Sequence, residues 1–303
     1  MDLGHLRYFI AVAEELHFTR AAERLGIKQP PLSLQIRQLE QEIGTPLFRR
    51  LTRGVELTES GIFLLAKARD ILRDVEKAKL SVQMRARGET GRIRLGFAGA
   101  TYFNPLIPAL VAGYRLKYPQ VAISPETNNT PRLIAGLNSG EVDLAFIRPA
   151  VGDTAGLGID LIVEEPMLIV VPAEHHLARK RSVPLAALAN ETWILHPRSI
   201  GPGLYDEIIA ACHASGFSPE VDQEASAIPS AVHLVSAGFG ISIVPQSLQQ
   251  IHAAGIVYVR IREDRPRAPI SIAYRRNDHS AAVRNFVALV KRKSSSSSNG
   301  IRA

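Results

Sequence analysis

The segment that most constrains the fold is residues 18–39, which read FTRAAERLGIKQPPLSLQIRQL. Two short helices joined by a tight turn fit this pattern, because Gly26 separates two stretches whose apolar residues recur at helical spacing. Ala21 is small enough to let the helices pack closely, and Gly26 can adopt the positive φ that such a turn favours. Pro30 and Pro31 fit only the first turn of the second helix. A chain of this kind can offer a helix to the major groove of DNA.

The second helix has a polar face that the apolar positions leave uncovered. Its side chains can reach phosphates or base edges, and Thr19 is expected to cap the first helix. An ordinary helical hairpin with a solvated face is the alternative that this segment alone leaves open. The residues that we expect to contact DNA from the two helices are Thr19, Gln29, Pro30, Ser33, Gln35 and Arg37.

A basic hairpin is expected directly after these helices. Residues 44–58 read GTPLFRRLTRGVELT, with a glycine turn followed by alternating apolar and polar residues. This pattern predicts a small β-ribbon, or wing, that carries Arg49, Arg50 and Arg53 toward a DNA backbone. A solvated basic loop is the alternative.

Residues 3–61 resemble the N-terminal winged helix-turn-helix of LysR-type transcriptional regulators. The resemblance rests on LGHLRYFIAVAEELHFTRAAERLGIKQPPLSLQIRQLEQEIGTPLFRR and on GVELTESG, with Ser60 where alanine is usual. The length and the downstream layout also fit, so the resemblance covers nearly the whole chain. It is equally similar to regulators of aromatic-acid catabolism (benzoate, muconate, phenylpropionate) and of the acetolactate–butanediol operon, which senses acetate.

A long helix is predicted over residues 61–87, which contain no proline and no internal glycine. Apolar residues at a heptad-like spacing indicate a seam for dimerisation, and packing of the helix on its own chain is the alternative. The RGETG sequence at 87–91 is expected to end the helix and to act as a hinge. The expected seam consists of Leu65, Ala68, Leu72, Val75 and Val82.

From Arg92 onward strands and helices alternate, which predicts an α/β sandwich with mostly parallel sheets, including separate strands near 161–163 and 167–171. The resemblance implies two lobes hinged like a periplasmic binding protein. The serine-rich end is expected to be disordered. The expected α/β organisation is a winged helix-turn-helix at 1–60, a linker helix and hinge at 61–91, an effector-binding domain at 92–293 (lobe I, 92–162 and 268–293; lobe II, 163–267), and a tail at 294–303.

Ligands of open α/β sheets bind at the carboxyl ends of strands, next to helix N-termini. Residues 97–102, 128–132 and 196–205 fit this description, and Arg148 directs a guanidinium to the same rim, with Arg198 as a further candidate. Such a cleft suits a small carboxylate. For Arg148 a surface ion pair is the alternative, and Thr130 is also expected to cap a helix. The resemblance implies effector contacts at Ala100, Thr101, Thr130, Arg148, Pro202, Gly203 and Leu204.

The net charge of +7 does not by itself indicate DNA binding, because of where it lies. Residues 1–58 carry eight Lys/Arg against seven Asp/Glu, a balance of +1, whereas residues 260–303 carry eleven against three, a balance of +8. The single cysteine, Cys212, is expected to be a buried small hydrophobe, which fits a reducing cytoplasm. No apolar stretch approaches the roughly 20 residues of a membrane span, so no membrane partner is expected.

Enzyme activity is not expected, because no GxSxG, HExxH, Walker or GxGxxG pattern occurs. The adjacent His175 and His176 lack metal-ligand spacing and are expected to be loop residues; no metal and no cofactor are expected.

The chain is therefore expected to be a cytoplasmic, sequence-specific DNA-binding regulator that a small organic acid modulates. The expected partners are double-stranded promoter DNA, RNA polymerase and the chain itself, as a dimer through the linker helix and, by resemblance, a homotetramer. Two alternatives remain open. One is a ligand-independent architectural protein, and the other is a helix-turn-helix fused to a solute-binding or catalytic α/β domain.

Overall fold

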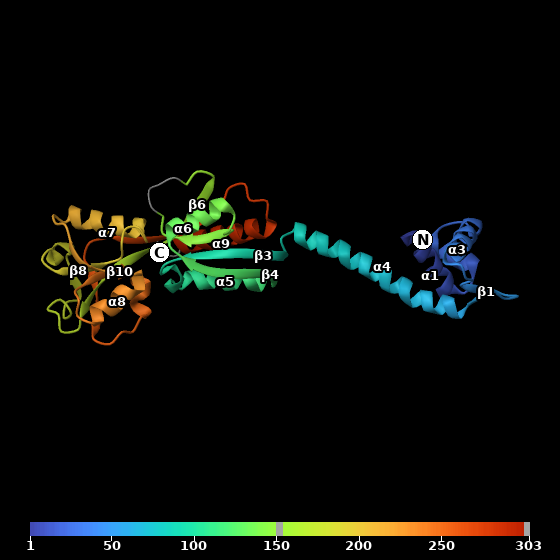
Figure 1. Ribbon diagram of the computed structural model, residues 1–303, viewed down its shortest axis with the longest axis horizontal. Helices are drawn as coiled ribbons and strands as arrows, with labels where there is room; N and C mark the ends of the chain where they lie inside the picture. Colours follow the sequence, from blue (N-terminus) through green and yellow to red (C-terminus); the bar gives the residue numbers. More distant parts are fainter. Residues whose placement is uncertain (150–153, 300–303) are drawn as a thin grey trace. The chain divides into compact units, whose positions relative to one another are not determined.

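The computed structural model describes residues 1–149 and 154–299, and the chain divides into two compact units, residues 1–84 and 85–303 (Figure 1). Each unit has cores of its own. Within the described part of the chain, no helix combines the length and the apolar character needed to cross a membrane. The expected fold class is confirmed: an N-terminal helix-turn-helix, a long linker helix and a C-terminal α/β domain.

The first unit is a small helical domain with a two-stranded wing. Phe9, Leu32 and Ile36 are almost completely buried in its core. The helix α2 begins differently from the sequence-based expectation: the N-cap is His17, whose Nδ1 accepts a hydrogen bond from the Thr19 backbone N–H at 3.2 Å, so Thr19 is not the cap. The elements are α1 (Leu3–Glu15), α2 (Phe18–Leu25), α3 (Gln29–Ile43), β1 (Phe48–Arg50), β2 (Val55–Leu57) and the greater part of α4 (Glu59–Ala86).

The linker helix α4 packs part of the expected seam against its own chain. Ala68 is fully buried in the core of the first unit, and Leu65 and Leu72 pack against the same core. These three residues therefore pack within their own chain. Heptad spacing alone could not distinguish this packing from packing against a second subunit. Val82 of the expected seam stays exposed, at 71%, and the apolar Ile71 is 38% exposed.

The second unit contains one long mixed sheet and two lobes. Its elements, in chain order, are β3 (Thr90–Ala98), η1 (Thr101–Phe103), α5 (Leu106–Lys117), β4 (Gln120–Asn128), α6 (Thr130–Ser139), β5 (Leu144–Ile147), β6 (Leu157–Pro172), β7 (Ser182–Val183), η2 (Leu185–Leu188), β8 (Thr192–Leu195), α7 (Pro202–Ala214), β9 (Glu220–Glu224), α8 (Ile228–Ser236), β10 (Ser242–Pro245), η3 (Gln246–Gln250), β11 (Ile256–Ile261), β12 (Arg267–Arg275) and α9 (Ala281–Asn299).

The strand β6 runs through both lobes, which corrects the expectation of two separate strands near 161–163 and 167–171. Its first part pairs with β12 as far as Pro166, and from Met167 it pairs with β10 and β11. The change of partner marks the passage from lobe I to lobe II. The sheet order is β4-β3-β5-β12-β6-β11-β7, with β10 also on β6. The sheets are mixed rather than mostly parallel, because β12 runs antiparallel to β5 and β6 as the chain returns to lobe I.

Each lobe has its own hydrophobic core. In lobe I, α5 and α9 contribute residues such as Leu110 and Phe286 to one core, whereas Leu133 of α6 belongs to another. In lobe II, α7 and α8 lie on either side of β8 and β10 (Figure 1), and Trp193 is fully buried there. The helix α9 is described to Asn299 and so overlaps the tail expected from residue 294. Residues 300–303 lie outside the described residues.

The start of α4 is fixed by a close approach at Gly61. The Thr58 hydroxyl donates to the Pro46 carbonyl at 2.8 Å and accepts from the Gly61 N–H at 3.0 Å. A Cβ at Gly61 would overlap the Leu47 carbonyl oxygen. Glycine is therefore the residue that lets α4 begin directly beneath the wing.

We predict that Gly61→Ala destabilises the chain by about 1–3 kcal/mol, because the added methyl group must displace the backbone at Leu47. Thermal unfolding of the purified protein measures the effect. The neighbouring Ser60→Ala, which introduces the residue usual at that place, serves as the matched control and should unfold like the unchanged chain. Equal unfolding temperatures for the two variants would contradict the close approach at Gly61.

Candidate DNA-binding and effector-binding sites

The helices α2 and α3 meet at a tight turn that small residues permit. Gly26 ends α2 with φ at 66°, the left-handed region that favours glycine, and the Ile27 N–H donates to the Ala22 carbonyl at 3.0 Å. Ala21 is fully buried at the contact between helices. Pro30 and Pro31 lie in the first turn of α3, as expected. The turn thus holds α3 as a rigid element with one face uncovered.

The outward face of α3 forms a stripe of exposed side chains at helical spacing. Pro30, Leu34, Arg37 and Gln41 are all exposed, and Gln29 is exposed at the start of the helix. Arg37 has no ion pair among the described residues. Leu34 and Gln41 also belong to this face, but they were not among the residues expected to contact DNA. Their positions three residues before and four residues after Arg37 place them on the same side of the helix and could have indicated this.

Two polar residues of α3 are less accessible than the sequence suggested. Ser33 is only 8% exposed, and its hydroxyl accepts a hydrogen bond from Gln29 Nε2 at 2.8 Å. It lies on the inward side of the helix, beside the buried Leu32, which corrects its expected place on the outward face. Gln35 is half-buried. The hydrogen bond to Ser33 therefore fixes the side chain of Gln29, which is exposed at the outward surface.

The wing is present as expected. The strands β1 and β2 pair antiparallel, with Arg49 opposite Glu56, and those two side chains form an ion pair at 3.1 Å. The Glu40 carboxylate of α3 accepts hydrogen bonds from the Leu47 and Phe48 N–H groups at 2.8 and 3.1 Å. This bond fixes the wing to the helix. Arg50 and Arg53 are exposed, and neither has an ion pair within the described residues.

One carboxylate of the first unit, Glu14 of α1, is engaged away from the exposed stripe of α3. Glu14 of α1 pairs with Arg69 at 2.7 Å and with Arg24 at 2.9 Å, and the hydrogen bond from Arg69 lowers the pKa of Glu14. Glu14 thus connects α1 to α2 and to α4. Although the balance of charge over residues 1–58 is only +1, Arg37 on α3 and Arg53 at the tip of the wing remain available for phosphates.

A pocket of about 260 Å³ lies in the second unit, where lobe I and lobe II residues meet. It combines apolar side chains with the N-terminal ends of α6, α7 and α8. Asn129 caps α6, so Thr130 is not the expected cap but the first residue of the helix. No side chain caps α7 at Gly201 or α8 at Ala227. Backbone N–H groups at such ends favour an anion. The lining residues are Ala98, Gly99, Thr127, Asn128, Asn129, Thr130, Arg148, Ile200, Gly201, Leu204, Ser226, Ala227 and Ile228.

Arg148 lines this pocket as part of a buried ion pair, rather than the surface ion pair considered as its alternative. Its Nη2 donates to Glu165 Oε1 at 2.8 Å, and the two side chains are 4% and 6% exposed. The other oxygen of Glu165 accepts from the Ser247 N–H at 2.9 Å. The buried Nε of Arg148 has no partner among the described residues. Burial lowers the pKa of Arg148, while Glu165 opposes that shift, so the guanidinium stays charged beside the pocket.

Three of the seven expected effector contacts line the pocket: Thr130, Arg148 and Leu204. Ala100 and Thr101 are fully buried instead, and Ala100 packs into the core of lobe II. Pro202 and Gly203 begin α7 outside the lining. The exposed Arg198 pairs with Asp206 at 2.6 Å and is not part of the pocket.

The sequence reasoning missed Glu165 and residues 226–228. The start of α8 carried the same signal as the other segments, a proline in the first turn of a helix, at Pro229. Glu165 gave no local signal, because its partners are distant in the chain.

Two other titratable groups of lobe II are buried. Burial lowers the pKa of His196, whose Nε2 lies 3.1 Å from the Gly201 carbonyl, so the imidazole is neutral at pH 7 beside the pocket wall. Cys212 is completely buried, as expected, and burial raises the pKa of its thiol to about 12. Such a thiol is unreactive as a nucleophile.

Comparisons with known proteins match both units. Residues 3–62 match the bacterial regulatory helix-turn-helix proteins of the lysR family, and residues 86–295 match the LysR substrate binding domain. The regulator BudR of Raoultella terrigena is 38% identical over 287 residues, which is 95% of this chain and 99% of that protein.

Two solved structures are also similar. Full-length CbnR in complex with its target DNA is 29% identical, with a TM-score of 0.85, and the match covers 97% of this chain and all of CbnR. The effector binding domain of BenM with its effector benzoate is 26% identical, with a TM-score of 0.60, over 69% of this chain and 94% of that domain. The named relatives are transcriptional regulators, which agrees with the expectation of a non-enzyme. The chain therefore belongs to the LysR family of DNA-binding transcriptional regulators that carry an effector-binding domain.

Proposed function

We propose that this regulator binds double-stranded promoter DNA in a sequence-specific manner and responds to a small organic carboxylate in the pocket that contains Arg148. The observation that carries the effector proposal is Arg148, which lines that pocket and whose buried Nε has no hydrogen-bond partner among the described residues. The DNA proposal rests on the exposed stripe of α3 with its free Arg37. The similar structures of CbnR with target DNA and of the BenM domain with benzoate support both parts.

A carboxylate fits the pocket better than a neutral ligand for two reasons. The guanidinium can donate to a carboxylate, and such charge-assisted bonds are stronger than bonds between neutral groups. The uncapped N-termini of α7 and α8 favour negative charge at the same place. Ile200, Leu204 and Ile228 supply an apolar wall for the organic part of the ligand.

The effector acts on a protein that self-associates. A stripe of apolar residues on α4 (Ile71, Val75, Ala78 and Val82, called the α4 stripe) is at the 3–4 spacing of a helix–helix seam. We propose a dimer through this stripe and a homotetramer of two dimers, in the cytoplasm, with RNA polymerase as a further partner. The effector must bind one arrangement of the subunits better than the other to change the response at the DNA.

We predict that Arg37→Ala weakens binding to the preferred DNA sequence by about 1–3 kcal/mol, the value of a good contact to a base. Fluorescence anisotropy with a labelled duplex measures the affinity. Arg115→Ala on α5 removes the same charge from an exposed position of the second unit and serves as the control. Unchanged affinity for Arg37→Ala would remove this residue from the reading face.

We predict that a neutral pair, Arg148→Gln with Glu165→Gln, loses carboxylate binding and retains DNA binding. Replacing Arg148 alone would leave Glu165 buried and unpaired, at a cost of about 3–5 kcal/mol, so both residues are changed. The double variant removes both charges and places an amide at each position, and glutamine at 148 also lacks the Nε–H of the arginine. The loss corresponds to a charge-assisted hydrogen bond, about 1.5–3 kcal/mol.

Isothermal titration with acetate, benzoate, muconate and phenylpropionate, each beside its amide, measures this loss. Arg198→Ala is the control, because that residue pairs with Asp206 away from the pocket. Wild-type binding of an amide as tightly as its acid, or binding of a carboxylate by the neutral pair, would contradict the proposed clamp.

We predict that Ile71→Glu with Val82→Glu weakens dimerisation at least tenfold, because burying the new carboxylates in a helix seam is unfavourable. Sedimentation velocity gives the dissociation constant. The control Lys79→Ala changes an exposed polar residue of α4 outside the α4 stripe and should not alter the constant. A dimer equally stable in the double variant would place the interface elsewhere.

A further inference from the structure

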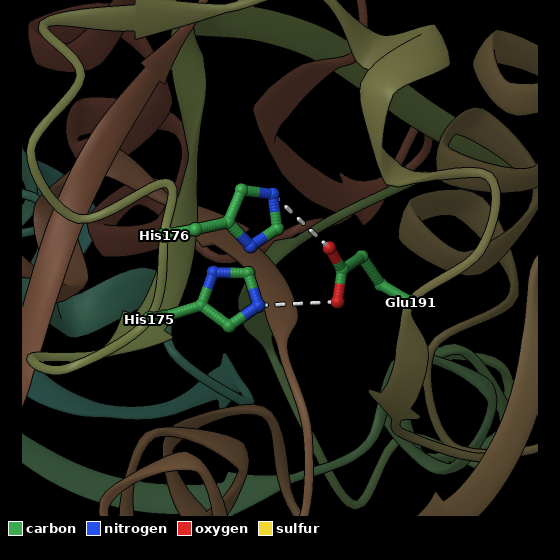
Figure 2. A group of neighbouring side chains, drawn as sticks. All are labelled: His175, His176 and Glu191. Carbon is green, nitrogen blue, oxygen red and sulfur yellow. Dashed lines mark hydrogen bonds and ion pairs between the residues drawn. The ribbon is translucent and has the colours of Figure 1, made fainter.

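Two histidines and a glutamate converge at the surface of lobe II (Figure 2). His175 and His176 follow β6, and Glu191 directly precedes β8. One potential ligand atom from each residue can be chosen so that all three lie within 4.8 Å of one another. Among the described residues, no other group of three His, Cys, Asp or Glu side chains comes this close.

Backbone hydrogen bonds bring these residues together. The His175 N–H donates to the Pro172 carbonyl at 3.0 Å, and the His175 carbonyl accepts from the Ala178 N–H at 2.9 Å. This tight turn places the two adjacent rings 4.5 Å apart between centroids. The Glu191 N–H donates to the Leu188 carbonyl at 3.2 Å, which fixes the backbone that carries the carboxylate.

The two imidazole rings face the Glu191 carboxylate (Figure 2). His175 Nε2 lies 3.1 Å from Glu191 Oε2, and His176 Nε2 lies 3.8 Å from Glu191 Oε1. The His175 and Glu191 side chains are 18% and 20% exposed, whereas His176 is 68% exposed. His175 and Glu191 are thus held in place by their surroundings, whereas the exposed His176 side chain is free to move toward them.

We propose that His175, His176 and Glu191 form a binding site for a divalent transition-metal ion, with Zn²⁺ as the best fit. Two imidazoles and one carboxylate are a ligand set that Zn²⁺ accepts, with water in the fourth position. Ligand atoms of a tetrahedral zinc lie roughly 3.3 Å apart, given bonds of about 2.0–2.1 Å. His176 Nε2 must move closer than its 3.8 Å from Glu191 Oε1, and the 68% exposure of this side chain leaves room for the movement. Neither Ca²⁺ nor Mg²⁺ fits, because both prefer oxygen ligands.

The protonation of His175 is compatible with metal binding after a change of tautomer. The Leu177 N–H donates to His175 Nδ1 at 3.3 Å, so the metal-free imidazole carries its proton on Nε2, where it faces Glu191. A metal on Nε2 requires the proton on Nδ1 instead. The hydrogen bond from Leu177, at 3.3 Å, is then lost, and the His175 ring must turn so that its Nδ1–H does not face the Leu177 N–H. The metal replaces the hydrogen bond to Glu191.

The sequence did not reveal this site, because the two adjacent histidines lacked a partner at metal-ligand spacing. Glu191 lies after η2, in a short segment without a recognisable motif, and only the fold brings it close to the histidines. A bound ion would tie the turn after β6 to the start of β8. Because an ion that binds only the folded chain stabilises it by mass action, binding should raise the unfolding temperature.

Titration of the full chain with ZnCl₂ and CoCl₂, after removal of metals with a chelator, tests the site. We expect one ion per chain by equilibrium dialysis, a higher unfolding temperature, and visible absorption bands of protein-bound Co²⁺. Failure of the wild-type chain to bind Zn²⁺ or Co²⁺ at micromolar concentrations would overturn the proposal.

Two variants locate the ion. His176→Ala alters an exposed side chain, and Glu191→Gln preserves the shape of the residue while removing its charge, so circular dichroism should show both folded. Each should lower Zn²⁺ affinity at least about tenfold, the loss that even an outer partner of a metal ligand can cause. His213→Ala, an exposed histidine of α7 in the same lobe, is the control and should bind like the wild type. Unchanged affinity in both site variants would overturn the proposal.

Discussion

The buried ion pair between Arg148 and Glu165 is the interaction on which the effector domain depends. Arg148 follows β5 of lobe I, and Glu165 lies on β6 just before that strand passes into lobe II. The same carboxylate accepts a hydrogen bond from the Ser247 N–H of η3 in lobe II. The Glu165 side chain therefore connects Arg148 in lobe I with lobe II. A charge buried this deeply is tolerated only with a partner and further hydrogen bonds. The pair therefore keeps a cation at the pocket without leaving it uncompensated, and a bound anion would compete with Glu165 for it.

In the first unit, by contrast, the cations expected to bind a ligand are exposed rather than buried in an ion pair. Its glutamates hold helices and wing together at Arg24, Arg69 and the N–H groups of Leu47 and Phe48. The cations on the stripe of α3 and at the tip of the wing remain in solvent, where phosphates can replace water. In both units, then, the distribution of ion pairs indicates function better than the net charge of the chain does.

Local signals in the sequence were sufficient for the helix-turn-helix, the wing and the long linker helix. The turn at Gly26 and the prolines of α3 depend on backbone rules that act within a few residues. The side on which Ser33 lies depends on the phase of α3 against its core, and the N-cap of α2 depends on the rotamer of His17. Neither follows from residue type alone.

Long-range contacts account for most of what could not be predicted. Separate strands were expected near 161–163 and 167–171, but pairing with β12 carries β6 through residues 164–166. The burial of Leu65, Ala68 and Leu72 depends on the first unit rather than on heptad spacing. The pocket itself was partly predictable, because helix N-termini and prolines are local features, whereas the partner of Arg148 was not.

The most direct test of the account is a selection of duplexes from a random pool by the purified chain, with and without a mixture of acetate, benzoate and muconate. We expect one enriched sequence with two half-sites about one helical turn apart, as a symmetric dimer requires, and a changed preference when the acids are present. Enrichment of no shared sequence under either condition would contradict the central claim that this chain reads promoter DNA.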